Sequence, residues 1–149
     1  MGRVFQHRRT VRFGECDPAG VVYYPVFFNW FHEAMEAWFE EGLGTPYAEA
    51  TRSVGFPARS TEAGFHSPCR MGERLTVLLS LSRLGRSSMR LELRIEGDDG
   101  GLRATGSVSC VCIGVEPDGF RFKSQAIPGT LRERMEPFLV SAVDGGQGA

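Results

Sequence analysis

The length, composition and charge of the chain exclude several classes of protein. Its 149 residues suit one domain with a sizeable core but not two. Hydrophobic residues make up 42% and charged residues 23%, which excludes a disordered chain. The 17 basic and 18 acidic residues leave a formal net charge of -1, so no excess of positive charge points to a nucleic acid partner.

The distribution of apolar residues favours a cytoplasmic protein without a membrane partner. The longest uncharged run, 18–31, holds two prolines and is too short for a spanning helix of about 20 residues. The first ten residues lack the apolar core of a secretion signal. Four cysteines show no CxxC spacing and no histidine at zinc-ligand spacing. We therefore expect reduced core thiols and no metal site at Cys16, Cys69, Cys110 and Cys112.

A strand and a turn are predicted at the start of the chain. Apolar residues among polar ones predict a first strand over 3–13. Its arginines are interpreted as a solvated face rather than a binding patch: Arg3, Arg8, Arg9 and Arg12. Glycines and a proline then predict a turn over 14–20, and a short extended piece follows over 21–24.

A long apolar helix is predicted to begin at Pro25. Proline suits the first turn of a helix, where its missing N–H costs nothing. Apolar side chains recur at helical spacing as far as Trp38, and Gly42 and Gly44 end the pattern. A short helix or loop is expected over 45–54.

The rest of the chain reads as antiparallel strands joined by short connections. Strands or extended segments are predicted over 56–68, 75–81, 89–95 and 102–115, the last of them central. Gly85–Ser88 and Asp98–Gly101 form the two turns between the later strands. A short helix follows over 130–140.

These elements predict an α+β fold in which a curled antiparallel sheet wraps around one long helix. We expect a single domain over 1–141 and a disordered tail over 142–149. Such a sheet leaves strand edges and an apolar flank exposed. A homo-oligomer is therefore expected, at least a dimer.

The turn before the helix is the strongest candidate for chemistry. A helix N-terminus exposes unpaired N–H groups and carries roughly half a positive charge, which suits it to hold an oxyanion. Asp17 lies just upstream in the turn sequence DPAG, where its carboxylate could act as general base or nucleophile. The alternative is that Asp17 and Pro18 only form a turn.

One motif resembles the signature of a known family. The stretch FGECDPAGVVYYP, residues 13–25, resembles the pattern of the hot-dog-fold acyl-CoA thioesterases, in particular the 4-hydroxybenzoyl-CoA thioesterase group. Residues 65–77, FHSPCRMGERLTV, are similar to the family's segment between its second and third strands. Glu15 departs from the usual Asp but keeps the charge. The resemblance implies the hot-dog fold and a thioester hydrolase that needs no cofactor.

The resemblance also assigns roles to residues of this motif. It implies that Asp17 attacks the thioester carbonyl or activates water to do so, and that the Tyr24 amide binds the carbonyl oxygen. Substrate contacts are predicted from the surrounding residues Gly20, Tyr23, Pro25 and Phe28. The aromatic run from Tyr23 to Trp30 favours an aryl or short acyl group, although core packing accounts for most of these rings.

Three further residues are predicted to contact the substrate. Arg86 and Ser88 lie in the loop that, by resemblance, meets the CoA phosphates, where the family often has a pair of basic residues. His32 occupies a helix position where the 4-hydroxybenzoyl type can have a carboxylate for the ring hydroxyl. Two of them also have a plain alternative. Arg86 could be an ordinary hairpin arginine, and His32 could be a solvated or interface histidine.

The resemblance leaves alternative functions open. An acyl-CoA partner is expected in every case, in a dimer or a dimer of dimers with the site between subunits. The substrate could instead be a short aliphatic acyl-CoA, or the protein could bind acyl-CoA without hydrolysing it. A dehydratase of this fold is disfavoured because its His-Phe-Pro-Gly run is absent.

Overall fold

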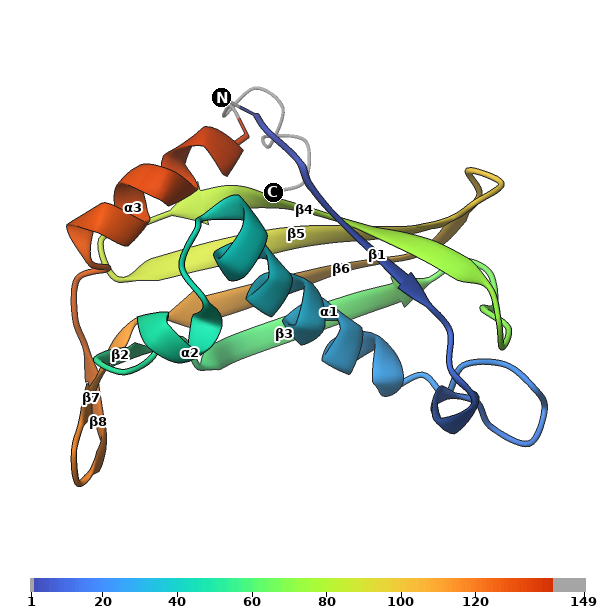
Figure 1. The fold of residues 1–149 in the computed structure, drawn as a ribbon, viewed down its shortest axis with the longest axis horizontal. Coiled ribbons are helices and arrows are strands. Elements are labelled where there is room, and N and C mark those ends of the chain that lie inside the picture. Colours follow the sequence, from blue (N-terminus) through green and yellow to red (C-terminus); the bar gives the residue numbers. More distant parts are fainter. Residues whose placement is uncertain (1, 141–149) are drawn as a thin grey trace.

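A five-stranded antiparallel sheet and a long helix form most of the fold (Figure 1). The structure, a computed structural model, describes residues 2–140, so the predicted tail over 142–149 lies outside the described residues. The strands lie in the order β1-β4-β5-β6-β3. Their bounds are Phe5–Thr10 for β1, Ala58–Phe65 for β3, Arg74–Leu84 for β4, Ser88–Gly97 for β5 and Leu102–Val111 for β6. The predicted antiparallel sheet is confirmed, and β6 is central as expected.

The long helix α1, Val26–Ala37, lies across one face of this sheet (Figure 1). It begins directly after Pro25, as the sequence predicts, and continues through a π-helical turn over Trp38–Gly42. Trp30, Phe31 and Trp38 are each at most 1% exposed. They pack against the apolar residues that alternate along β4 and β5, such as Leu79 and Leu91. Burial of these rings holds α1 against the sheet.

A glycine in β6 lets α1 approach the sheet closely. A Cβ atom at Gly106 would lie 2.2 Å from Cζ of Phe31 and 3.0 Å from the carbonyl oxygen of Glu62. The Phe31 ring therefore occupies the space that a side chain at 106 would need. This contact fixes the distance between α1 and the centre of the sheet.

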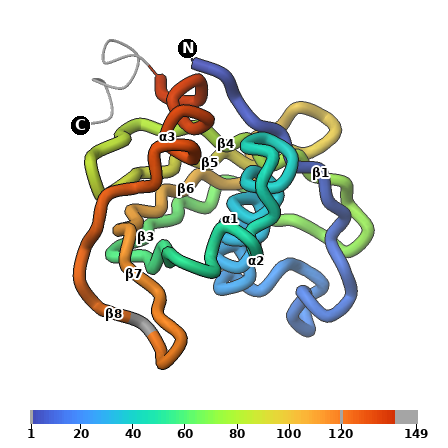
Figure 2. The backbone as a smooth tube through the Cα atoms, turned by 60° about the vertical axis from the view of Figure 1, so that its left-hand side comes forward, coloured from blue at the N-terminus to red at the C-terminus, as the bar shows by residue number. Residues whose placement is uncertain are grey.

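A second, smaller sheet was not predicted. It joins β2 (Val54–Gly55), β7 (Ile113–Glu116) and β8 (Gly119–Ser124). The predicted strand over 102–115 was wrong at its end, because the main sheet stops at Val111 and the chain turns into β7. Figure 2 shows the hairpin of β7 and β8 projecting from the rest of the chain.

Short helices complete the chain. The helix α2, Tyr47–Ala50, lies beside α1, and α3, Gly129–Met135, follows β8. Single 3-10 turns lie at Phe13–Glu15 and Glu136–Phe138. Within the described residues, no helix is long and apolar enough to cross a membrane.

Candidate active site

The turn that carries Asp17 is held by its own hydrogen bonds. The Asp17 amide donates to the Val21 carbonyl at 2.9 Å, and the Gly20 amide donates to the Asp17 carbonyl at 2.9 Å. Gly20 has φ +82°, a left-handed conformation that favours glycine. One carboxylate oxygen of Asp17, Oδ1, accepts from the Ala19 amide at 2.9 Å. The side chain is half-buried, and among the described residues no partner is assigned to its other oxygen.

One backbone amide just before α1, that of Tyr24, is available for a ligand. The amides of Val26, Phe27 and Phe28 donate to carbonyls three residues earlier, at 2.9 to 3.1 Å. The Tyr23 amide donates to the Glu15 carbonyl at 3.0 Å. Among residues 2–140 no acceptor is assigned to the Tyr24 amide, and Pro25 has no N–H to compete with it. This N–H group is a hydrogen-bond donor at the positive end of α1.

The Tyr24 ring extends the site toward an edge of the sheet. Its side chain is 60% exposed, and its ring centroid lies 6.2 Å from that of Phe65 at the end of β3. Phe65 also contacts Phe27, with ring centroids 5.2 Å apart. The Asp17 end of the molecule thus meets the free edge of the sheet through aromatic side chains.

A partly buried ion-pair network anchors the Asp17 turn to α1 and β1. Arg9 lies between two carboxylates, with its Nη2 2.6 Å from Oε1 of Glu15 and its Nη1 2.8 Å from Oε1 of Glu33. His7 Nε2 also lies 2.8 Å from Glu33. Trp30 Nε1 donates to Glu15 at 2.8 Å. The interpretation of Arg9 as part of a solvated face is wrong, because its side chain is only 9% exposed.

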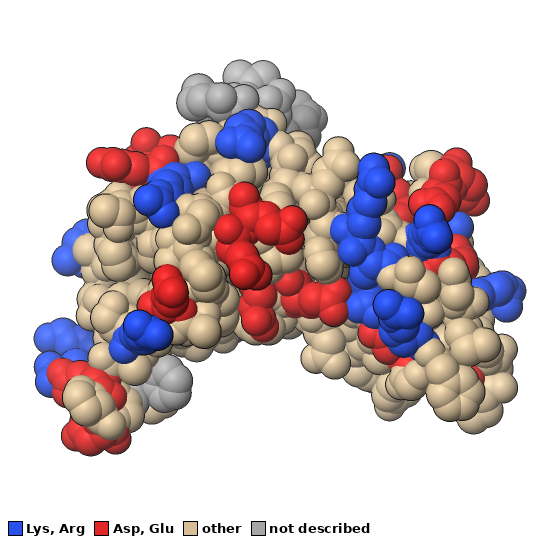
Figure 3. Space-filling model, in the orientation of Figure 1, with Lys and Arg blue, Asp and Glu red and all other residues tan. Residues whose placement is uncertain are grey.

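Figure 3 shows acidic side chains over α1 beside basic side chains over β1. The pairs of Arg9 and His7 with Glu33 join these two elements. Arg9 also lies over the Trp30 ring, 4.7 Å from its centroid. Charge pairing and ring contact together explain why a strand arginine is buried here.

Glu15 is expected to stabilise the fold only when ionised. Burial alone would raise the pKa of Glu15, but hydrogen bonds from Trp30, the Arg12 amide and Arg9 outweigh it and lower the pKa below 4.5. A lowered pKa gives stability that is present above pH 4.5 and lost as the pH falls through the folded-state value. Glu15→Gln should therefore cost about 2 kcal/mol of unfolding free energy at pH 7.

The pH dependence of unfolding checks this prediction. Urea unfolding of both proteins at pH 7 and pH 3 should show a difference that shrinks at the lower pH, because Glu15 takes up a proton in the unfolded chain before it does so in the folded protein. An equal difference at both pH values would show that the charge of Glu15 does not matter.

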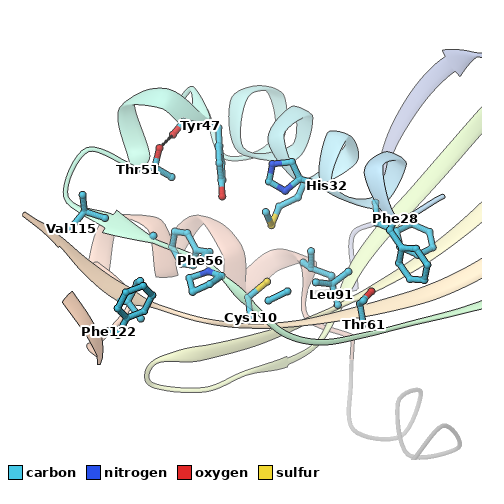
Figure 4. Close-up of a pocket in the computed structure, with 17 residues that line it drawn as sticks. Phe28, His32, Tyr47, Thr51, Phe56, Thr61, Leu91, Cys110, Val115 and Phe122 are labelled. Atoms are coloured by element: carbon cyan, nitrogen blue, oxygen red, sulfur yellow. Dashed lines mark hydrogen bonds between the residues drawn. The ribbon is translucent and has the colours of Figure 1, made fainter. Parts of the chain in front are cut away.

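A large apolar cavity lies along α1. Its volume is about 650 Å³, it is open to solvent on one side, and residues of α1, α2, β3, β5, β6 and the β7–β8 hairpin line it (Figure 4). Phe28 and His32 line it, as a substrate-binding role for them requires. Most of its other lining residues are apolar, including Phe56, Val108 and Phe122. Phe28, in the first turn of α1 and four positions after Tyr24, is the lining residue nearest to the Asp17 turn in the sequence; Asp17 and Tyr24 themselves do not line the cavity.

The predicted phosphate-binding residues lie far from Asp17 within one chain. The register pairs Thr10 with Arg74, so the Asp17 turn follows the strand end where β4 begins. Arg86 and Ser88 lie beyond the other end of β4, whose 11 residues span about 35 Å. Arg86 is exposed, while its backbone carbonyl accepts from the Ile127 amide at 2.9 Å. A single chain does not bring this loop to the Asp17 turn.

Two polar side chains meet at the cavity wall. His32 Nε2 lies 2.8 Å from Glu36, and the His32 ring contacts Tyr47 with centroids 5.6 Å apart. Burial, with smaller contributions from Cys110 and Glu36, raises the pKa of Tyr47 to about 12. The Tyr47 hydroxyl is therefore protonated at neutral pH.

Several cavity residues were not predicted. Tyr47 lies in the segment 45–54, which was expected as a short helix or loop, Phe56 begins the predicted extended segment over 56–68, and Cys110 was expected only as a core thiol. Thr61 on β3 also lines the cavity. The sequence feature that could have singled out Tyr47 is its place directly after Pro46, because a proline often marks the start of a helix.

Cysteines and metal-binding groups add no further site. Cys69, Cys110 and Cys112 are buried free thiols, as expected, whereas the free thiol of Cys16 is only partly buried and is not a core thiol. Burial raises the pKa of Cys110 to about 11. Across residues 2–140, no group of three or more His, Cys, Asp or Glu side chains gathers where it could hold a metal ion.

Comparison with known proteins identifies the family. Residues 11–136 match the model of the thioesterase-like superfamily. The chain is similar to 1,4-dihydroxy-2-naphthoyl-CoA hydrolase of Prochlorococcus marinus strain MIT 9303, with 36% identity over 99 residues. That match covers 60% of this chain and 66% of the relative, slightly less than two thirds of its length.

Solved structures show the same fold. A gentisyl-coenzyme A thioesterase is 28% identical with a TM-score of 0.75, covering 89% of this chain and 99% of that one. A 4-hydroxybenzoyl-CoA thioesterase variant in complex with 4-hydroxybenzoyl-CoA is 23% identical with a TM-score of 0.77, and the same shares are covered. The predicted hot-dog fold is confirmed, and the chain belongs to the thioesterase-like superfamily.

Proposed function

We propose that this protein hydrolyses an aryl-CoA thioester to the free acid and CoA. The observation that carries the proposal is the arrangement at the start of α1. The Asp17 carboxylate is fixed in its turn, the Tyr24 amide lacks an acceptor among the described residues, and an apolar cavity lies along the same helix from Phe28 onward. The similar hydrolase of Prochlorococcus marinus acts on a thioester of this kind.

The Tyr24 amide serves as the oxyanion donor in this proposal. When the thioester carbonyl is attacked, negative charge develops on its oxygen. A fixed N–H group at the positive end of a helix stabilises that charge without reorganising. Removing one such donor from an active site typically costs about 10²–10³ in kcat.

Asp17 can act in either of two ways. As general base, its carboxylate takes a proton from water while the water oxygen attacks the carbonyl carbon, and the C–S bond then breaks as the proton passes to the CoA sulfur. As nucleophile, its oxygen attacks and displaces the CoA thiolate, which leaves a mixed anhydride. Water then cleaves that anhydride to free acid and restores Asp17. Both routes give the same products.

The size of the cavity favours an acyl group larger than one ring. An apolar cavity of about 150 Å³ binds benzene, whereas this one measures about 650 Å³. A 4-hydroxybenzoyl group would leave much of it empty. The name of the similar Prochlorococcus hydrolase contains a naphthoyl group, and the two fused rings of such a group would fill more of the cavity than a single ring. The apolar lining also suits a short aliphatic acyl group, which ranks second because it would fill even less of the cavity.

The proposal includes a cytoplasmic homo-oligomer. The β3 strand is an edge of the main sheet, and Figure 3 shows the molecule hollowed on that side. Antiparallel pairing of two β3 edges would bring the Arg86 loop of one copy toward the Asp17 turn of the other. In such a pair, Arg86 and Ser88 of one copy could contact the phosphates of a CoA ester bound at the Asp17 turn of the other copy, which they cannot do within a single chain.

Light scattering during size-exclusion chromatography tests the oligomer. At micromolar concentration the expected mass is that of a dimer or tetramer. A uniform monomer of 16.4 kDa would contradict an active site shared between copies.

A thiol-release assay tests the function itself. We expect the purified protein to release free CoA from naphthoyl-CoA and benzoyl-CoA faster than from butyryl-CoA. Release mainly from butyryl-CoA would favour the aliphatic alternative. Binding of all three esters without release would show a binding protein, and hydration of an enoyl-CoA would show a dehydratase.

A further inference from the structure

We infer that the Tyr47 hydroxyl selects acyl groups that carry an oxygen acceptor remote from the thioester carbonyl. The inference rests on the proposed function, since the ligand is the acyl part of the thioester. It concerns a residue outside the Asp17 motif and assigns it a role in specificity.

The position of Tyr47 puts its hydroxyl inside the cavity. Tyr47 is the first residue of α2, and Figure 4 shows its side chain reaching down from α2 with the oxygen facing the open space. Edge contacts with Phe39 and His32, with ring centroids 5.0 and 5.6 Å apart, hold the ring in this direction. The hydroxyl is thus presented by a ring that is packed on two sides.

Three tyrosine or threonine hydroxyls line the described cavity, and that of Tyr47 is the one still free to donate a hydrogen bond to a ligand. Thr51 Oγ1 donates to the Tyr47 carbonyl at 2.7 Å, and Thr61 Oγ1 donates to the Ser107 carbonyl at 3.0 Å. Within residues 2–140, no hydrogen bond is assigned to the Tyr47 hydroxyl. A half-buried donor of this kind gains a partner when a ligand supplies an acceptor.

The surroundings of Tyr47 define the class of acyl group. Apolar residues line the cavity between Phe28 and Tyr47, including Phe31 and Met35 on α1. A flat apolar body fits this stretch, and a hydroxyl or keto oxygen at its far end meets Tyr47. A single unsubstituted ring supplies neither the length nor the oxygen. The expected ligand is therefore a fused-ring or extended acyl group with one oxygen at the end away from the thioester.

The test pairs two acids that differ by one hydroxyl. Binding of 6-hydroxy-2-naphthoic acid and 2-naphthoic acid to the wild-type protein and to Tyr47→Phe is measured by calorimetry. The wild type should bind the hydroxylated acid about tenfold more tightly, as expected for one hydrogen bond. Tyr47→Phe, which keeps the ring contacts, should abolish this preference and leave the affinity for 2-naphthoic acid within twofold.

Turnover of the two CoA esters gives a second, independent readout. The kcat/KM for the hydroxylated ester, divided by that for the unsubstituted ester, should fall about tenfold in Tyr47→Phe. The whole change should come from a lower kcat/KM for the hydroxylated ester. An unchanged ratio, or an equal loss for both acids and both esters, would overturn the role of Tyr47. Absence of all turnover in the wild type would refute the proposed function instead, and the binding measurement would still decide whether Tyr47 recognises the hydroxyl.

Discussion

Replacing Asp17 with Asn is expected to lower kcat for aryl-CoA hydrolysis by about 10³-fold or more. The amide keeps the shape of the side chain and an oxygen that can accept from the Ala19 amide, which Oδ1 of Asp17 does at 2.9 Å. It cannot take a proton from water, and it is a poor nucleophile. The turn should therefore survive while the reaction stops. Affinity for the intact ester, measured by calorimetry, should stay within a few-fold of wild type.

Asp98→Asn is the matched control for this substitution. Asp98 is an exposed carboxylate in the turn between β5 and β6, and its loss should leave kcat unchanged. Near-normal hydrolysis by Asp17→Asn would remove Asp17 from the mechanism. A loss of ester affinity as large as the loss of kcat would instead make Asp17 a binding residue.

Gly106→Ala is expected to destabilise the protein by about 3 kcal/mol, at the upper end of the cost of overpacking a core. The new Cβ would lie 2.2 Å from Cζ of Phe31, a ring that is 1% exposed and belongs to the hydrophobic core. The ring or α1 itself must move away from β6. For a domain of this size, the melting temperature should fall by roughly 10 °C, which differential scanning calorimetry measures directly.

Two further variants isolate the steric cause. Gly129→Ala adds a Cβ where nothing lies within 4 Å, so its stability should differ little from wild type. Phe31→Leu shortens the opposing side chain, so its combination with Gly106→Ala should cost less than the sum of the two single changes. Additive costs would show that Phe31 is not the obstacle.

The main sheet and α1 were predictable because their patterns are local. Residues 89–95 alternate apolar and polar side chains, and the structure buries Met89, Leu91, Leu93 and Ile95 on one face. Pro25 marked the start of α1 correctly. In contrast, β8 was missed because it pairs only in a small sheet, which gives it no long apolar stripe. The end of β6 was placed too late because apolar residues continue into β7 on both sides of Cys112.

The site was predictable only where a motif carries it. The motif singled out Asp17 and Tyr24, and the geometry around them is consistent with that prediction, though no observation tests their roles. The burial of Arg9 depends on Glu15, Glu33 and Trp30, which meet only in the folded chain. The cavity likewise combines residues from α1 to β8, and two of them, Phe28 and Phe122, are more than 90 positions apart in the sequence. No local pattern contains such a combination.

Release of free CoA from 2-naphthoyl-CoA by the purified protein tests the central claim most directly. We expect equal amounts of thiol and naphthoic acid, with kcat/KM of about 10⁴ M⁻¹s⁻¹ or more for the wild type and almost no release by Asp17→Asn prepared in parallel. Ester that binds to the wild-type protein but remains intact would contradict it.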